Sequence, residues 1–246
     1  TALHQKKNRS ESGLFLIEGI KGVQEALKCG LEIKNTFINR SSKINSLEFP
    51  EEKIYFVDEK ILKKISTTET PPDIVAVAYQ VKFSLKDLFK GNNALIIVLE
   101  NIKDAGNLGT IIRTAKAANV SGIILTGECI DIYNPKVVRS SAANLWKIPV
   151  VYFEKISDLR QELEKYGYFQ FLATKVGNDE KQSLYYEFDY KQPTVIFFGS
   201  EAEGISDKLA NQADKFIKIP MNEEVESLNL SISAGIIIYE AFKQRR

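Results

Sequence analysis

Short apolar runs alternate with amphipathic segments along the chain, which is the pattern of α/β proteins. Residues 14–18 form an apolar run that predicts a buried strand, and residues 21–28 predict a helix that ends before Gly30. Further strands are expected at residues 36–39, 54–57 and 74–80, and a further helix at residues 59–65. We therefore expect residues 1–80 to form a small α/β domain.

A second alternating unit follows a polar segment, residues 81–93, which is the expected linker. Residues 94–99 are an unbroken apolar run, of the kind that a parallel sheet buries on both faces. Additional strands are expected at residues 122–125, 169–173, 194–198 and 215–219, with helices at 108–118, 158–166 and 230–243. The pattern predicts that residues 94–246 fold as an open, mostly parallel α/β sheet with helices on both faces.

Composition excludes several kinds of chemistry. The two cysteines, Cys29 and Cys129, lie far apart in the sequence, so we expect neither a disulfide framework nor a zinc site. His4 is the only histidine, which argues against catalytic triads and against metal sites built on histidine. No apolar run approaches the roughly 20 residues of a membrane span, and no apolar leader follows the basic N-terminal residues. We therefore expect a cytoplasmic protein that binds no metal and has no membrane segment.

Charge is distributed unevenly although the net charge is only +1. Residues 1–90 carry 15 Lys and Arg against 12 Asp and Glu, whereas residues 91–246 carry 18 against 20. Three cations lie within the first ten residues, and such a cluster can contact phosphates, but a solvated tail explains it equally well. The candidate phosphate contacts are Lys6, Lys7, Arg9, Arg40 and Lys43.

Three unusual loops follow apolar strands, where ligands bind in open α/β sheets. The first, residues 101–109, runs into a helix that carries Arg113, and its asparagines and glycines permit tight turns beside free helix amides. An ordinary connection with Asn107 as a cap and Arg113 on the surface is the alternative.

The second loop, residues 199–204, has a glycine at each end and carries Glu201 and Glu203. It lacks the lysine of a P-loop, and its carboxylates suit a cationic or hydroxyl-bearing ligand, with a solvated acidic turn as the alternative. The third, residues 219–229, places Ser227 and Asn229 at the start of the last helix, where a simple N-cap is the alternative.

Together the three loops resemble the motifs of the SpoU/TrmH family of RNA ribose methyltransferases, in order and in spacing. The matching residues are Asn101, Asp104, Asn107-Leu-Gly109 and Arg113-Thr-Ala115 in the first loop and its helix, Gly199-Ser-Glu201-Ala-Glu-Gly204 in the second, and Ile219-Pro-Met221 with Ser227-Leu-Asn229 in the third. Residues 14–19 resemble the L30e-like substrate-binding domain that is often fused to these enzymes. Departures from the family pattern at Ala105, Glu223 and Ala143 remove no proposed catalytic side chain.

The resemblance implies a catalytic domain with a C-terminal trefoil knot that binds S-adenosylmethionine, and a homodimer. It implies a catalytic set of Arg113, Glu201, Ser227 and Asn229. It implies a cofactor set of Thr174, Gly199, Glu201, Gly204, Ile219, Met221 and Leu228. Asn107 and Arg113 join the basic residues of the N-terminal domain as the expected contacts to RNA.

The resemblance also implies the reaction: methyl transfer from S-adenosylmethionine to a ribose 2′-OH of structured RNA, with ribosomal RNA preferred over transfer RNA. Arg113 acts either as a base or, more easily for a group that stays protonated, as an electrostatic stabiliser of the alkoxide. A catalytically silent RNA-binding module on the same fold is the main alternative. A Rossmann enzyme is disfavoured because no GxGxxG follows a predicted strand, and base methylation because Ser-Leu-Asn marks the ribose branch.

Overall fold

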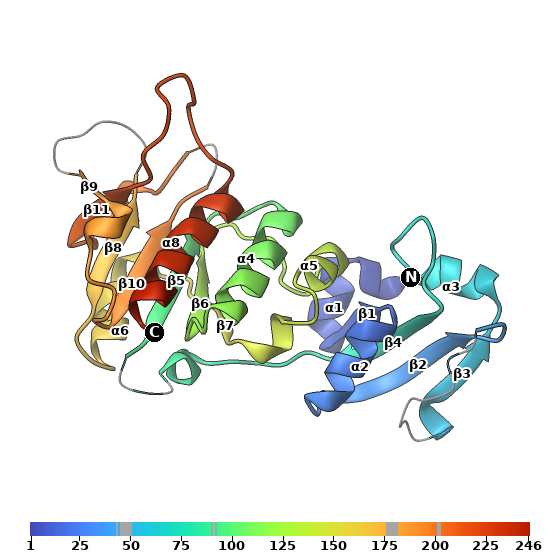
Figure 1. The fold of residues 1–246 in the computed structure, drawn as a ribbon. Helices are drawn as coiled ribbons and strands as arrows, with labels where there is room; N and C mark the ends of the chain where they lie inside the picture. The colour runs from blue at the N-terminus through green and yellow to red at the C-terminus, as the bar shows by residue number, and fades with distance from the viewer. Residues whose placement is uncertain (43, 45–50, 90, 92, 176–181, 201–202) are drawn as a thin grey trace. The chain divides into compact units, whose positions relative to one another are not determined.

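Two compact units make up the computed structural model in Figure 1, which describes residues 1–42, 44, 51–89, 91, 93–175, 182–200 and 203–246. The N-terminal unit consists of Thr1–Lys82 together with Asp131–Lys147. The C-terminal unit consists of Phe83–Ile130 together with Ile148–Arg246. The domain bounds inferred from the sequence instead assign residues 131–147 to the C-terminal domain and treat residues 81–93 as a linker, a segment that the two units share between them.

The N-terminal unit is built on a four-stranded sheet in the order β1-β4-β2-β3. Its strands are β1 (Leu14–Glu18), β2 (Ile33–Asn39), β3 (Ile54–Val57) and β4 (Ile74–Tyr79), and its helices are α1 (Lys6–Ser12), α2 (Ile20–Lys28), α3 (Glu59–Ile65) and α5 (Pro135–Ser140). β4 pairs antiparallel with β1 and β2, and β2 pairs parallel with β3. Leu62 of α3 is fully buried against Leu16 and Val75, so the apolar positions that predict these elements form the core.

The segment Asp131–Lys147 belongs to the N-terminal unit because its aromatic and charged side chains pack there. The centroid of the Phe15 ring lies 4.7 Å from that of the Tyr133 ring and 6.2 Å from that of the Trp146 ring. Lys147 pairs with Glu25 at 2.6 Å, and Arg139 pairs with Glu18 at 3.3 Å. These contacts join distant parts of the sequence, which the local pattern of residues does not reveal.

The alternative of a solvated tail for the first ten residues is wrong, because a helix, α1, forms there and buries Arg9. Arg9 of α1 is 2% exposed, and its guanidinium pairs with Asp131 at 2.6 Å and donates to the carbonyl oxygens of Leu3 and His4 at 2.8 Å. A guanidinium that is buried and saturated in this way has a structural role, so Arg9 is not presented to RNA phosphates. Lys6 and Lys7 remain exposed on the same helix.

The C-terminal unit contains a seven-stranded sheet in the order β7-β6-β5-β10-β8-β11-β9, and all its pairs are parallel. The strands are β5 (Leu95–Glu100), β6 (Gly122–Thr126), β7 (Val150–Tyr152), β8 (Gln170–Thr174), β9 (Gln182–Leu184), β10 (Thr194–Phe198) and β11 (Lys215–Lys218). The helices are α4 (Ala105–Ala117), α6 (Leu159–Glu164), α7 (Asp207–Ala210) and α8 (Leu230–Gln244). The predicted parallel α/β architecture is therefore confirmed.

Helices cover both faces of this sheet (Figure 1). On one face, α6 and α7 bury Leu159, Leu163 and Leu209 against alternate residues of β5, β8 and β10. On the other face, α4 and α8 pack against each other. Every residue of β5 and β10 is buried, as expected for central strands of a parallel sheet. In the part of the chain that the structure describes, no helix is long and apolar enough to cross a membrane.

Replacing Arg9 tests its structural role. We expect Arg9→Met to lower the free energy of unfolding of the N-terminal unit by about 3 kcal/mol, because it leaves Asp131 without its cationic partner. Urea unfolding followed by fluorescence of Trp146, the only tryptophan, reports on this unit. Lys6→Met on the exposed side of the same helix is the matched control, with an expected change within about 0.5 kcal/mol. Equal stability of the two variants would contradict the structural role.

Candidate active site

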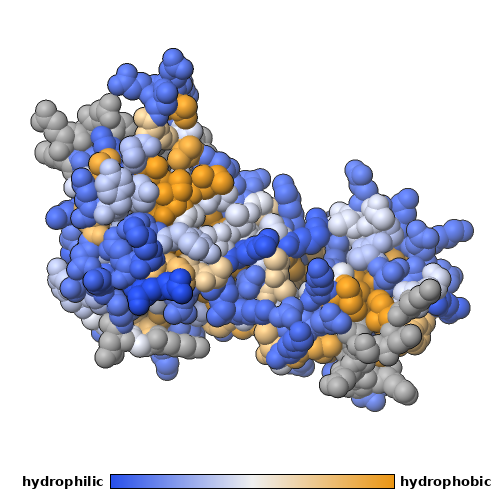
Figure 2. All heavy atoms as spheres, in the orientation of Figure 1, coloured by the Kyte–Doolittle hydropathy of each residue, from blue (hydrophilic) through white to orange (hydrophobic). Residues whose placement is uncertain are grey.

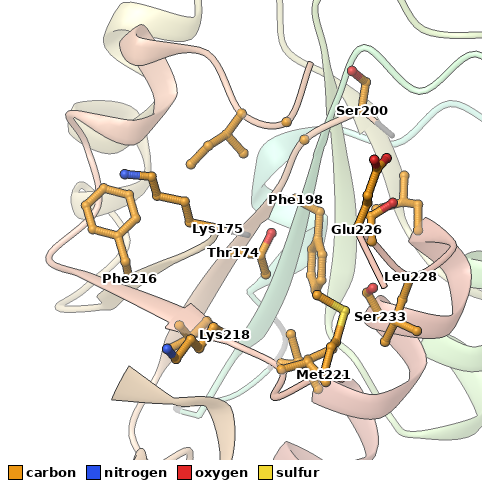
Figure 3. A pocket seen from close by; sticks show the side chains of 18 of the residues that line it. Thr174, Lys175, Phe198, Ser200, Phe216, Lys218, Met221, Glu226, Leu228 and Ser233 are labelled. Carbon is orange, nitrogen blue, oxygen red and sulfur yellow. The ribbon is translucent and has the colours of Figure 1, made fainter. Parts of the chain in front are cut away.

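A cavity of about 1310 Å³ opens at the carboxyl ends of β8, β10 and β11 (Figure 3). Its wall is formed by the loop after β10 and by the segment between β11 and α8. Seven of the predicted site residues line it, namely Thr174, Gly199, Gly204, Ile219, Met221, Ser227 and Leu228. Glu201, predicted for both catalysis and cofactor binding, lies outside the described residues. The structure thus brings together in one cavity every described member of the predicted cofactor set.

The loop after β10 closes on itself through its backbone. Ser200 and Gly204 exchange two N–H···O hydrogen bonds of 3.0 Å, and the Ser200 hydroxyl oxygen accepts from the Glu203 amide at 3.1 Å. Gly199 touches the returning chain so closely that a β-carbon there would lie 1.9 Å from the Gly204 carbonyl carbon. Gly204 itself has a φ of +67°, in the left-handed region. Both glycines of the motif are therefore required by the backbone path of the loop.

The end of β8 forms the opposite wall. The Thr174 hydroxyl donates to the carbonyl oxygen of Phe197 at 3.1 Å, which ties β8 to β10 at the cavity. The Lys175 ammonium lies 5.6 Å from the centroid of the Phe216 ring on β11, and Figure 3 shows both side chains on the same side of the cavity. Residues from the ends of β8, β10 and β11 therefore meet at this cavity.

Acidic side chains outnumber basic ones around the cavity. The lining residues include four carboxylates, Glu203, Asp207, Glu223 and Glu226, but only two lysines, Lys175 and Lys218. This balance suits a ligand that carries positive charge. Asp207, Glu226 and both lysines are site residues that the sequence did not reveal. Lys175 follows β8 and Lys218 ends β11, and no local motif marks either lysine.

A second polar cluster lies at the N-termini of α4 and α8. The Asn229 amide nitrogen donates to Asn107 Oδ1 at 3.0 Å, and the Asn107 backbone N–H donates to Asp104 Oδ1 at 2.7 Å. Asn229 Oδ1 also accepts from the backbone N–H of Ser231 at 2.9 Å, so Asn229 caps α8. Asn229 is therefore the N-cap of α8, as the alternative interpretation of the sequence predicted. Its side chain also links the third motif to Asn107 of the first motif.

Arg113 lies on the exposed surface of α4, outside the cavity lining. Its guanidinium forms no hydrogen bond or ion pair with any residue that the structure describes, so it is available to an external anion. Asn107 and Asn229 are likewise not among the lining residues. Ser227, however, lines the cavity only two residues before Asn229 in the chain. The structure thus divides the predicted residues into a cavity set and an α4–α8 set that the segment 227–229 connects.

The predicted RNA contacts of the N-terminal unit differ in their exposure. Lys6, Lys7 and Arg40 are exposed, and the Arg40 guanidinium donates to the Phe56 carbonyl oxygen at 3.3 Å. Arg9 is buried, as described above, and Lys43 lies outside the described residues. Among the described residues no group of three or more His, Cys, Asp or Glu side chains is arranged to hold a metal ion. Burial raises the pKa of the Cys129 thiol, which disfavours a thiolate nucleophile there.

Comparisons with known proteins agree with this site. Residues 94–239 match the SpoU rRNA Methylase family, and residues 1–76 match the MRM3-like substrate binding domain. The 23S rRNA (guanosine(2553)-2′-O)-methyltransferase RlmP of Bacillus subtilis is 30% identical over 96% of this chain and 92% of its own length.

Solved structures of RNA methyltransferases also resemble this chain. The SpoU methyltransferase AviRb from Streptomyces viridochromogenes, in complex with the cofactor AdoMet, superposes with a TM-score of 0.87 at 26% identity, over 99% of this chain and 95% of that one. The AdoMet-bound rRNA methyltransferase from Sinorhizobium meliloti gives 0.85 at 32% identity, over 98% and 92%.

The chain belongs to the SpoU rRNA methylase family. The predicted family, the enzyme class of RNA methyltransferase and the cofactor S-adenosylmethionine are thereby confirmed.

The close backbone approach at Gly199 gives a test of the cavity. We expect Gly199→Ala to lower kcat/KM for S-adenosylmethionine by about 100-fold, because its β-carbon displaces Gly204 by an ångström or more. Gly235→Ala on α8 is the control, since its β-carbon would lie 3.9 Å from Thr114, an ordinary contact distance. Cofactor titration and steady-state kinetics measure both variants. Wild-type kinetics in folded Gly199→Ala would show that the cavity is not the cofactor site.

Proposed function

We propose that this protein transfers a methyl group from S-adenosylmethionine to a ribose 2′-OH of ribosomal RNA. The observation that carries the proposal is the cavity that collects the described members of the predicted cofactor set, together with Ser227, two residues before Asn229 of the α4–α8 set. Ribosomal RNA is preferred over transfer RNA because the RlmP relative is named for 2′-O-methylation of 23S rRNA.

The cavity fits this cofactor in size and in chemistry. Its volume of about 1310 Å³ exceeds that of most small-ligand pockets, and its acidic lining suits a molecule with a sulfonium and an ammonium group. When bound, the cofactor supplies a methyl group on a sulfonium, which is a good leaving group. Backbone groups of Gly199 and Leu228 would hold it, with Thr174, Ile219 and Met221 packed around them.

The α4–α8 set would bind and orient the RNA. A ribose 2′-OH is a weak nucleophile while protonated, so the site has to stabilise negative charge as it develops on that oxygen. Arg113 is exposed and has no partner among the described residues, and its permanent positive charge suits a phosphate or a developing alkoxide. Ser227 and the Asn107–Asn229 pair would orient the nucleotide between Arg113 and the cavity. We therefore assign Arg113 an electrostatic role, in preference to that of a base, and the proton of the 2′-OH passes to solvent water as the methyl group leaves the sulfonium.

Replacing Arg113 separates chemistry from cofactor binding. Arg113→Ala should lower the rate of methyl transfer by about 100-fold or more, because the charge that stabilises the alkoxide is removed. Its affinity for S-adenosylmethionine, measured by calorimetry, should match the wild type because Arg113 does not line the cavity. Lys116→Ala removes another exposed cation from α4 and should retain turnover. Wild-type turnover in Arg113→Ala would exclude the proposed role.

We also propose a homodimer that forms through α8. Ile232 and Tyr239 on this helix are about half exposed, and with Ile236 they form an apolar stripe at helical spacing. Figure 2 shows apolar side chains gathered over the first turns of α8. A stripe of this kind on a helix whose other face packs on α4 suits a second copy of the same chain.

A charge placed in this stripe tests the dimer. Tyr239→Glu should shift the protein from dimer to monomer in light scattering, because a carboxylate buried in an apolar interface loses its hydration. Tyr168→Glu serves as the control, since Tyr168 is 80% exposed on a different part of the surface. A wild-type protein that is monomeric, or a Tyr239→Glu variant that remains dimeric, would rule out this interface.

The predicted trefoil knot also belongs to this proposal. Its support is the order of the strands: β11 lies two places beyond β10, yet residues 219–229 return the chain to α8, which packs against α4. Residues of that segment line the same cavity as the loop after β10. A chain end that passes through a loop of the sheet on this path would form the knot.

A further inference from the structure

A buried carboxylate lies next to the cavity without lining it. Glu100, the last residue of β5, is 2% exposed. In the parallel pairing of β5 with β10, Leu99 is opposite Phe198, so Glu100 lies beside the start of the loop at Gly199. Among the described residues no lysine, arginine or histidine lies within ion-pair distance of Glu100. A buried anion without a cation is costly, so its hydrogen bonds must compensate.

Both oxygens of this carboxylate are hydrogen-bonded to one residue. Glu100 Oε2 accepts from the Ser206 backbone N–H at 2.7 Å, and Oε1 accepts from the Ser206 hydroxyl at 2.6 Å. These are the short distances of charge-assisted hydrogen bonds. Ser206 in turn caps α7, since its hydroxyl oxygen accepts from the Leu209 amide at 3.3 Å. A single carboxylate thus fixes the place where the chain leaves the loop after β10.

Fixing Ser206 also fixes the cavity wall. Ile205 and Gly204 immediately precede Ser206, line the cavity and press against Gly199. The loop therefore has two attachments, the pairing of β10 with β5 at its start and the Glu100–Ser206 hydrogen bonds at its end. Releasing the second attachment would let Gly204 and Ile205 move away from the cofactor cavity.

We propose that Glu100 is a positioning residue for cofactor binding, which acts through its two hydrogen bonds to Ser206 on the loop after β10. The inference rests on the proposed function, since it assigns the cavity to S-adenosylmethionine. It requires the hydrogen bonds of Glu100 and not its charge. A neutral side chain that reproduces the hydrogen bonds should therefore retain cofactor binding.

Calorimetric titration of the full chain with S-adenosylmethionine tests the proposal. Glu100→Ala should raise the Kd about tenfold, whereas Glu100→Gln should stay within about threefold, because its amide can accept from the Ser206 N–H and donate to the hydroxyl. The rate of methyl transfer at saturating cofactor should change less than about threefold in Glu100→Ala, since this residue does not touch the reacting groups. Glu128→Ala, which removes an exposed carboxylate two residues after the neighbouring strand β6, is the matched control and should bind as the wild type does.

The possible outcomes separate this role from the proposed function. Wild-type protein that does not bind S-adenosylmethionine would contradict the proposed function itself. Wild-type binding together with an unchanged Kd in folded Glu100→Ala would overturn only the role of Glu100, as would equal weakening in Glu100→Gln. If Glu100→Ala does not fold, Ser206→Ala decides: weaker cofactor binding supports the positioning role, and an unchanged Kd overturns it.

Discussion

Parallel pairing of β5 with β10 is the constraint on which the rest of the C-terminal unit depends. Both strands are buried along their whole length, so their apolar residues fix the register, Leu95 with Thr194 through Leu99 with Phe198. The register brings the carboxyl ends of both strands to the same edge of the sheet. The loop that leads to α4 and the loop after β10 therefore begin side by side, and the chemistry of the site follows from that placement.

Two polar clusters are built on this edge, and they differ in what they can bind. The cavity has glycine-rich backbone walls and excess carboxylates, which suit a compact cationic cofactor. The α4–α8 cluster has an exposed arginine and paired asparagines, which suit an anionic polymer with hydroxyl groups. The segment between Ser227 and Asn229 belongs to both. This difference in binding preference gives a physical reason why the methyl donor and the acceptor would meet at the segment that the two clusters share.

Much of the fold and of the site follows from local sequence. The bounds of β1, β3, α3 and β10 coincide with the predicted ones because each is an apolar run or amphipathic turn between clear breakers. Asn101 also fits its position for a local reason, because its φ is +55°, a conformation that asparagine tolerates better than most residues. The family motifs identify the expected cofactor residues in the sequence. The structure shows that the described ones line the same cavity.

What the sequence did not predict depends on contacts between distant residues. The burial of Arg9 requires Asp131, which lies 122 positions away, and the same holds for the pairing of Lys147 with Glu25. Glu100 looks like the last residue of an apolar strand, and only the structure reveals its two hydrogen bonds to Ser206. Short elements such as β7, β9 and α7 have too few residues for a periodic pattern, so their neighbours in the sheet and core determine them.

The most direct test is methyl transfer from labelled S-adenosylmethionine to ribosomal RNA that lacks its own modifications. After digestion to nucleosides, we expect label in a single 2′-O-methylated nucleoside. Label on a base would contradict the assignment to ribose. Absence of label despite cofactor binding, with ribosomal RNA presented both free and in ribosomal particles, would contradict the enzymatic account and favour a catalytically silent RNA-binding module.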